Sequence, residues 1–136
     1  RIGAMGISGG GTHTFFSTAL DPRIKACVIS GYFCDWRDSI LTIDGCTCNY
    51  VPGLLKLGDI TDFAGLIAPR PCLIEHADHD QFFKLSGTKR AVAGARKAWQ
   101  AFGKPDLLET DFFEARHVVH GARAYDFLLE YVAGKK

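Results

Sequence analysis

A serine flanked by glycines follows the first apolar run of the chain. Residues Gly6-Ile7-Ser8-Gly9-Gly10 form a G-x-S-x-G pattern, with a helix expected directly after it. In this pattern a sharp turn from strand to helix exposes the serine hydroxyl. The helix directs its first N–H groups toward the turn, so the N–H of Gly9 is the expected donor to an oxyanion. The pattern predicts Ser8 as a nucleophile; the alternative is a glycine-rich turn that only allows close packing.

A serine hydroxyl needs a base, and the base needs a group that orients it. One later apolar run ends in Glu75-His76-Ala77-Asp78-His79-Asp80, and the next ends in Phe113-Glu114-Ala115-Arg116-His117. A large class of serine hydrolases has the same order of serine, acid and histidine. We therefore expect Asp80 to be the acid and His117 the base. Asp78 competes for the acid role, because it also lies just past the strand and strand ends are predicted only to within a few residues.

The elements that must position these residues alternate between strand and helix. Short apolar runs suited to buried parallel strands are Ile2–Met5, Ala26–Ile29, Cys72–Ile74 and Leu107–Phe112. Apolar residues at helical spacing predict helices at Thr12–Leu20, Asp59–Ile67, Ser86–Phe102 and His117–Val132. This repetition predicts one α/β domain over residues 1–136. We expect a three-layer sandwich around a short, mainly parallel sheet of about four strands.

The segment 31–58 departs from this alternation. It shows weak periodicity and is long for a connection inside a compact domain, so we interpret it as an irregular excursion over one end of the sheet. Aromatic residues occur at its start and just after the predicted acid. We expect four of them to line a substrate pocket: Tyr32, Phe33, Trp36 and Phe82.

The five cysteines cannot all pair within one molecule. Cys27 and Cys72 lie in apolar runs and are expected to be buried free thiols. Cys46 and Cys48 form a C-x-C pair, which is a weak metal signal without a second pair at suitable spacing. A disulfide from Cys34 to one of these two stays open.

The charge balance argues against one class of partner. Lys and Arg number 16 and Asp and Glu 15, which gives a net charge of +1. A nucleic-acid surface needs a clear positive excess, so no nucleic-acid partner is expected. The sequence also has no apolar run of about 18 residues and no signal-peptide pattern, so no membrane partner is expected and no compartment is indicated.

These residues give the chain a family resemblance. It resembles the C-terminal half of α/β-hydrolase esterases of the acetyl xylan esterase, dienelactone hydrolase and prolyl-oligopeptidase-like kind. The matching pieces are Gly6–Gly10, Ala19–Ala26, Cys48–Leu54, Leu66–Pro71, and His117 with Gly121. The resemblance implies Ser8 as nucleophile, Asp80 as acid and His117 as base, with no cofactor. It also implies hydrolysis of carboxylic esters, with small acyl groups as the expected substrates. Ala77 and Ala115-Arg116 depart from the family, which commonly has glycines there.

Two other functions stay open. The second oxyanion donor of such enzymes comes from a loop after an earlier strand. No such strand precedes Arg1, so the chain is expected to be N-terminally truncated, and an impaired catalyst acting as an assembly module is one alternative. Its first strand would be an unpaired apolar edge, which predicts a homo-oligomer. The other alternative is a metal-dependent hydrolase, with a metal held by His76, Asp78, His79 and Asp80 together with His117 or His120.

Overall fold

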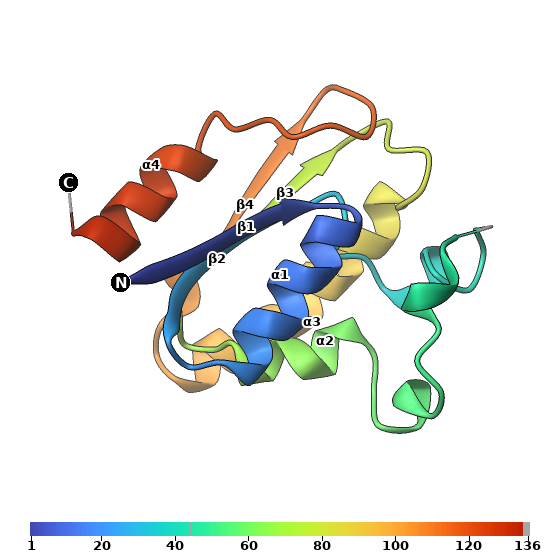
Figure 1. Cartoon of the computed structure of the whole chain (residues 1–136), viewed down its shortest axis with the longest axis horizontal. Coiled ribbons are helices and arrows are strands. Elements are labelled where there is room, and N and C mark those ends of the chain that lie inside the picture. Colours follow the sequence, from blue (N-terminus) through green and yellow to red (C-terminus); the bar gives the residue numbers. More distant parts are fainter. Residues whose placement is uncertain (44, 135–136) are drawn as a thin grey trace.

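Four parallel strands form one sheet at the centre of the molecule (Figure 1). The computed structural model describes residues 1–43 and 45–134 of the 136-residue chain. The strands lie in the order β1 (Ile2–Ile7), β2 (Ile24–Ser30), β3 (Cys72–Ala77) and β4 (Leu108–Phe113). All three neighbouring pairs are parallel. The carboxyl ends of all four strands therefore lie at one edge of the sheet, which is where α/β folds place their sites.

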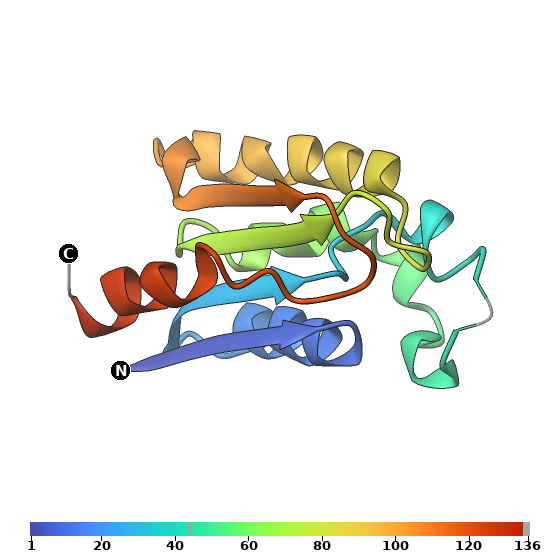
Figure 2. The same cartoon turned by 90° about the horizontal axis from the view of Figure 1, so that it is seen from above.

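Helices cover both faces of this sheet (Figure 2). On one face lie α1 (Gly9–Leu20), α2 (Ile60–Phe63) and α3 (Leu85–Ala101). The other face carries α4 (Ala124–Leu128), which continues as a π-helical turn. The predicted three-layer α/β sandwich with four strands is thus confirmed. Within the described residues, no helix combines the length and the apolar character needed to cross a bilayer.

The core divides into two apolar clusters, one on each face of the sheet. The larger lies under α1, α2 and α3 and includes the fully buried Phe15, Ile60 and Trp99. The smaller holds Phe127 of α4 against the opposite face of β2 and β3. Burial of a side chain such as Phe15 or Phe127 contributes about 1.5–3 kcal/mol. Because both faces of β2 and β3 are covered, these two strands are the most deeply buried of the four.

The last helix begins later than the sequence predicts. The interpretation of His117–Val132 as one helix is wrong at its start, because residues 117–123 form a loop and α4 begins at Ala124. The chain must cross the sheet edge here to pass from the end of β4 to α4 on the far face (Figure 2). Gly121 has a φ of +76°, which interrupts any helix, and the N–H groups of His120 and Gly121 bind a side chain of β3 instead.

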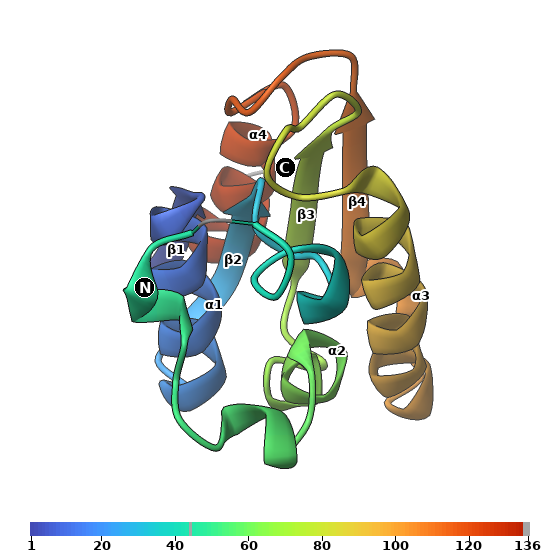
Figure 3. The ribbon, with the colours of Figure 1, turned by 90° about the vertical axis from the view of Figure 1, so that its right-hand side faces the viewer.

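The segment after β2 runs beyond the carboxyl end of that strand in Figure 2 and lies toward the viewer in Figure 3. In its described part it forms only short 3₁₀ turns, at Trp36–Asp38, Thr47–Asn49 and Leu54–Lys56. Ion pairs hold its first turn against α3, since Arg90 bonds the carboxylates of Asp35 and Asp38. The segment therefore covers the edge of the sheet that carries the predicted catalytic residues.

The cysteines are all free thiols in this structure. Cys27 and Cys72 are in register on β2 and β3, and both are buried as expected. Burial also raises the pKa of the Cys34 thiol to about 11, so this group is protonated and unreactive at neutral pH. Cys34 does not pair with the exposed Cys46 or Cys48, whose two sulfur atoms lie 2.9 Å apart.

Candidate active site

Ser8 occupies the turn between β1 and α1 in a conformation that side chains rarely adopt. Its φ is 56° and its ψ is −120°, and it is the one non-glycine residue in the described ranges with a positive φ. The turn brings the two elements so close that a Cβ atom on Gly6 would lie 2.3 Å from the carbonyl oxygen of Gly10. Strain of this kind costs about 1–3 kcal/mol and concentrates at functional sites. The half-buried Ser8 therefore sits in the geometry expected of a nucleophile elbow.

The amino end of α1 follows Ser8 directly. The first hydrogen bond of the helix runs from the Thr12 N–H to the Ser8 carbonyl, at 2.9 Å. The N–H groups of the preceding glycines thus have no acceptor within the helix. Gly9, the predicted oxyanion donor, is exposed and has open space at its Cα. An anion that forms near Ser8 would meet these donors and the positive end of the helix dipole.

Asp80 and His117 form a buried pair. The Oδ2 atom of Asp80 lies 2.7 Å from Nδ1 of His117, and the Asp80 side chain is only 1% exposed. The other oxygen, Oδ1, accepts the N–H groups of Phe82 and Phe83 at 2.8 and 3.1 Å. Asp78, by contrast, is exposed at the surface. Of the two candidate acids, Asp80 is therefore the one that contacts the histidine.

The His117 ring is enclosed on several sides. Phe83 stacks on it at a centroid distance of 5.9 Å, and Phe82 meets it edge-on at 5.0 Å. Beneath it lies Gly31, with a φ of +49°, where a Cβ atom would be 3.1 Å from Cε1 of the ring. The Nε2 atom is buried and has no hydrogen-bond partner among the described residues. Since Nδ1 faces the Asp80 carboxylate, Nε2 is the nitrogen left to accept a proton.

Ser8 and His117 both contact the carboxyl end of β2, although no hydrogen bond joins the two side chains. The Ser8 N–H donates to the carbonyl of Ser30 at 3.1 Å, and the next residue, Gly31, supports the His117 ring. Ser8, Asp80 and His117 therefore follow β1, β3 and β4 and gather at the edge where these strands end. Their order and their placement resemble a Ser-His-Asp catalytic arrangement.

The predicted substrate-contacting aromatic residues separate into two groups. Tyr32, Phe33 and Trp36 are 3%, 1% and 5% exposed and belong to the larger core cluster. Only Phe82, at 43% exposure, stands open beside His117. Sequence reasoning missed Gly31 and Phe83, which both touch the His117 ring. A glycine directly after a buried strand was the available signal for the first, whereas nothing distinguished Phe83 from its neighbour.

An apolar cavity lies beside the first turn of α1. Its volume is about 290 Å³. Trp36 lines it together with side chains of the segment after β2: Ile40, Leu41, Asn49, Tyr50, Val51, Pro52, Leu54 and Leu55. The Asn49 side chain also contacts the Thr12 hydroxyl at 3.4 Å, and Thr12 bonds the Ser8 carbonyl. Both oxygens face the single hydroxyl proton of Thr12, so the cavity wall meets the first turn of α1 through one polar contact, between Asn49 and Thr12.

The predicted metal cluster is not assembled. His76 is buried, with its Nδ1 atom 3.3 Å from the Thr88 hydroxyl of α3, whereas Asp78 and His79 are exposed. Within the described residues, the group with the spacing of metal ligands is a different one, Glu75, Asp111 and His120. The end of β3 at Ala77 explains the result, because His76 is held within the strand against α3, whereas Asp78 and His79 lie in the turn that follows and face solvent.

The buried His76 predicts a dependence of stability on pH. Burial lowers its pKa from the ordinary 6.5, and His117 adds to this effect, while the carboxylates of Asp80 and Asp78 oppose it. The unfolded chain then takes up a proton at a higher pH than the folded chain does. The stabilisation is therefore complete above about pH 6.5 and is lost as the pH falls below that value.

We expect the melting temperature of the chain to fall between about pH 7 and pH 5, and to fall less in His76→Gln. Thermal unfolding followed by circular dichroism at a series of pH values measures both slopes. Equal slopes in the two proteins would assign the pH dependence to other groups.

The chain is similar to proteins that are named as hydrolases and esterases. No family model matches the chain. The protein YtaP of Bacillus subtilis (strain 168), which is named as a hydrolase, is 34% identical over 96 residues, or 66% of this chain and 31% of YtaP. A glucuronoyl esterase of carbohydrate esterase family 15 from Caldicellulosiruptor kristjansonii matches 97% of this chain with a TM-score of 0.76 at 19% identity. The methylesterase BT1017 matches 96% of it with a TM-score of 0.72 at 25% identity.

The matched proteins are considerably longer than this chain. It spans 31% of YtaP, 43% of the Caldicellulosiruptor enzyme and 29% of the methylesterase. The glucuronoyl esterase catalytic domain of Hypocrea jecorina matches 100% of this chain with a TM-score of 0.75 at 19% identity. The matched region is 45% of that domain. The expected resemblance to esterases is confirmed, and the chain has the fold of one part of them.

Proposed function

We propose that the chain, which has the fold of part of an α/β-hydrolase and is similar to esterases, hydrolyses carboxylic esters through Ser8, His117 and Asp80. One observation carries the proposal. The strained Ser8 turn and the His117–Asp80 pair lie at the same edge of the sheet, and the Nε2 atom of His117 is left without a partner. Buried polar atoms without a hydrogen-bond partner are rare in folded proteins, and a catalytic role is one of the recognised explanations for such an atom.

The chemistry proceeds through an acyl-enzyme. His117 accepts the hydroxyl proton of Ser8 at Nε2 while Oγ attacks the carbonyl carbon of the ester. The N–H of Gly9 stabilises the negative oxygen that forms, and Asp80 stabilises the imidazolium. His117 then gives its proton to the departing alcohol. Water, deprotonated by the same histidine, releases the carboxylic acid and restores Ser8.

Small groups are the proposed substrate class. Ligand pockets commonly measure about 300–1,000 Å³. The apolar cavity, whose wall residue Asn49 contacts Thr12 of α1, lies just below that range at about 290 Å³, which suits a small acyl or alcohol group. The names of the similar proteins, glucuronoyl esterases and a methylesterase, support a carboxylic ester as substrate. Of the four aromatic residues expected to contact substrate, Trp36 lines this cavity and Phe82 is exposed beside His117.

A covalent probe tests the proposed nucleophile without depending on the substrate. A fluorophosphonate should modify the chain once, and mass spectrometry of a digest should place the adduct on the peptide that contains Ser8. Hydrolysis of p-nitrophenyl acetate provides the parallel assay. A chain that forms no adduct and releases no nitrophenol would contradict the proposal.

We also propose that copies of the chain associate through β1. Within the described residues this strand pairs only with β2, so the backbone groups of its other edge have no strand partner. Ile2 on the strand is 46% exposed. Unpaired edges of this kind recruit further strands.

Light scattering coupled to gel filtration should give at least twice the 14.9 kDa mass of the chain. Ile2→Lys should shift the protein toward the monomer, because a charge disfavours edge-to-edge pairing. A clean monomer at high concentration would contradict this proposal.

A further inference from the structure

A second carboxylate residue near the site, Glu75, has a smaller exposed fraction than Asp80 when whole residues are compared. Glu75 lies on β3 and is 0% exposed, and its side chain is on the face of the sheet opposite His76. Removing a carboxylate from water is costly unless hydrogen bonds replace the lost hydration. The proposed catalytic steps do not use this group. Its burial therefore calls for another explanation.

The two oxygens of Glu75 bind the loop that carries His117. Oε2 accepts the N–H of His120 at 3.1 Å, and Oε1 accepts the N–H of Gly121 at 2.7 Å. The main-chain carbonyl of Glu75 accepts the N–H of Gly31 at 2.9 Å, and Gly31 lies under the His117 ring. One residue of β3 thus fixes the support below His117 and the backbone just after it.

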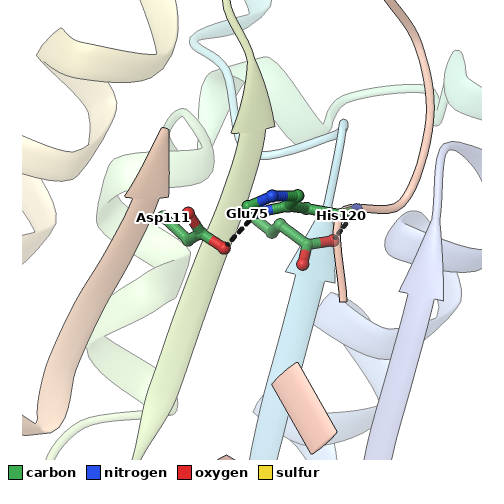
Figure 4. A group of neighbouring side chains, drawn as sticks. All are labelled: Glu75, Asp111 and His120. Atoms are coloured by element: carbon green, nitrogen blue, oxygen red, sulfur yellow. Dashed lines mark hydrogen bonds and ion pairs between the residues drawn. The ribbon is translucent and has the colours of Figure 1, made fainter. Parts of the chain in front are cut away.

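The same loop is held from β4 as well. Nδ1 of His120 lies 2.8 Å from Oδ2 of Asp111, as Figure 4 shows, and its ring stacks on Phe113 at a centroid distance of 4.3 Å. Glu75, Asp111 and His120 therefore form one connected cluster, in which the Glu75 carboxylate makes the bonds to the backbone. The loop is bound to two neighbouring strands.

We propose that Glu75 is a positioning residue, whose carboxylate holds residues 117–121 so that the His117 ring stays against Asp80. The role rests on the proposed function, because positioning matters to catalysis only if His117 is the base. Both loop N–H groups need an acceptor, and a carboxylate offers one on each oxygen. A glutamine at this position has a single carbonyl oxygen, so its NH₂ group would face one of the two donors.

Glu75→Gln should lower kcat for p-nitrophenyl acetate by about 10- to 100-fold and leave KM within about twofold, because small misplacements of a catalytic group have effects of that size. Glu109→Gln is the matched control. Glu109 is a carboxylate on β4, on the face of the sheet that also carries the Glu75 side chain. Its hydrogen bonds go to Arg123 and not to the backbone of residues 117–121. Its kcat should stay at the parental value.

A second measurement is independent of turnover. The Nδ1 proton that His117 shares with Asp80 should give a strongly downfield proton NMR signal in the parent and in Glu109→Gln. This signal should broaden or disappear in Glu75→Gln. If Ser8→Ala remained active but Glu75→Gln still lost the signal, the catalytic proposal would fail and the positioning role would stand.

A parental kcat together with a parental NMR signal in Glu75→Gln would overturn the positioning role. If that variant does not fold, Glu75→Asp applies the same test, because aspartate keeps both acceptors on a side chain shorter by one methylene. Its loop bonds lengthen, and we expect an intermediate kcat and a weakened signal. Unchanged values in Glu75→Asp would equally overturn the role.

Discussion

Replacing Ser8 with alanine is expected to reduce ester hydrolysis by about 10,000-fold or more, since loss of the nucleophile in such enzymes removes nearly all of the rate enhancement. The structure indicates that this substitution removes the nucleophile without destabilising the fold. Ser8 forms no side-chain cap on α1, so removal of its hydroxyl breaks no hydrogen bond that holds the helix. The strained backbone of the turn is retained by the close packing around Gly6.

The experiment compares kcat/KM for p-nitrophenyl acetate and the yield of fluorophosphonate adduct in the parent and in Ser8→Ala. Ser17→Ala is the matched control, because Ser17 is an exposed serine on the same helix. The control should match the parent in both measurements. Substantial hydrolysis by Ser8→Ala would show that another group performs the reaction.

Replacing Asp80 with asparagine is expected to lower kcat by about 10,000-fold, even though the residue keeps its shape. The local hydrogen bonds explain why. One oxygen of Asp80 accepts the N–H groups of Phe82 and Phe83. An asparagine would keep its carbonyl oxygen there and turn its NH₂ group toward Nδ1 of His117. The imidazole would then carry its proton on Nε2, where it cannot accept the proton of Ser8.

Asp78→Asn is the control for this variant, because Asp78 is an exposed carboxylate two residues away. Its kcat should remain within about twofold of the parental value, as is usual for surface substitutions away from the site. Steady-state kinetics on both variants measure the contrast. A large loss in Asp78→Asn together with a small one in Asp80→Asn would reverse the assignment of the acid.

The sheet and the serine turn could be predicted because their signals are local. Apolar runs with small or turn-forming neighbours specify buried strands, and Gly6 is required by its close contact with the Gly10 carbonyl four residues later. The partner of His117 could not be fixed in the same way. Asp78 and Asp80 follow the same strand, and only the fold shows that Asp80 lies under the His117 loop while Asp78 faces solvent.

The start of the last helix and the substrate-contacting aromatic residues were harder for a related reason. Residues 117–123 contain nothing that forbids a helix except Gly121, and the bonds to Glu75 that replace helical ones come from a strand about 45 residues earlier. Phe33 is an aromatic residue at the start of the irregular segment, which suggested a pocket, yet it packs edge-on against Phe15 in the core. Tertiary contacts decided both outcomes, and no local pattern records them.

The separation between the catalytic groups and the segment after β2 has an evolutionary consequence. Ser8, Asp80 and His117 depend on strand ends and short turns, whereas most of the cavity wall comes from a stretch that adds no strand to the sheet. Insertions, deletions and substitutions in that stretch would leave the strands that support the proposed triad intact. Changes of sequence in that stretch should therefore alter the cavity without moving the groups of the proposed triad.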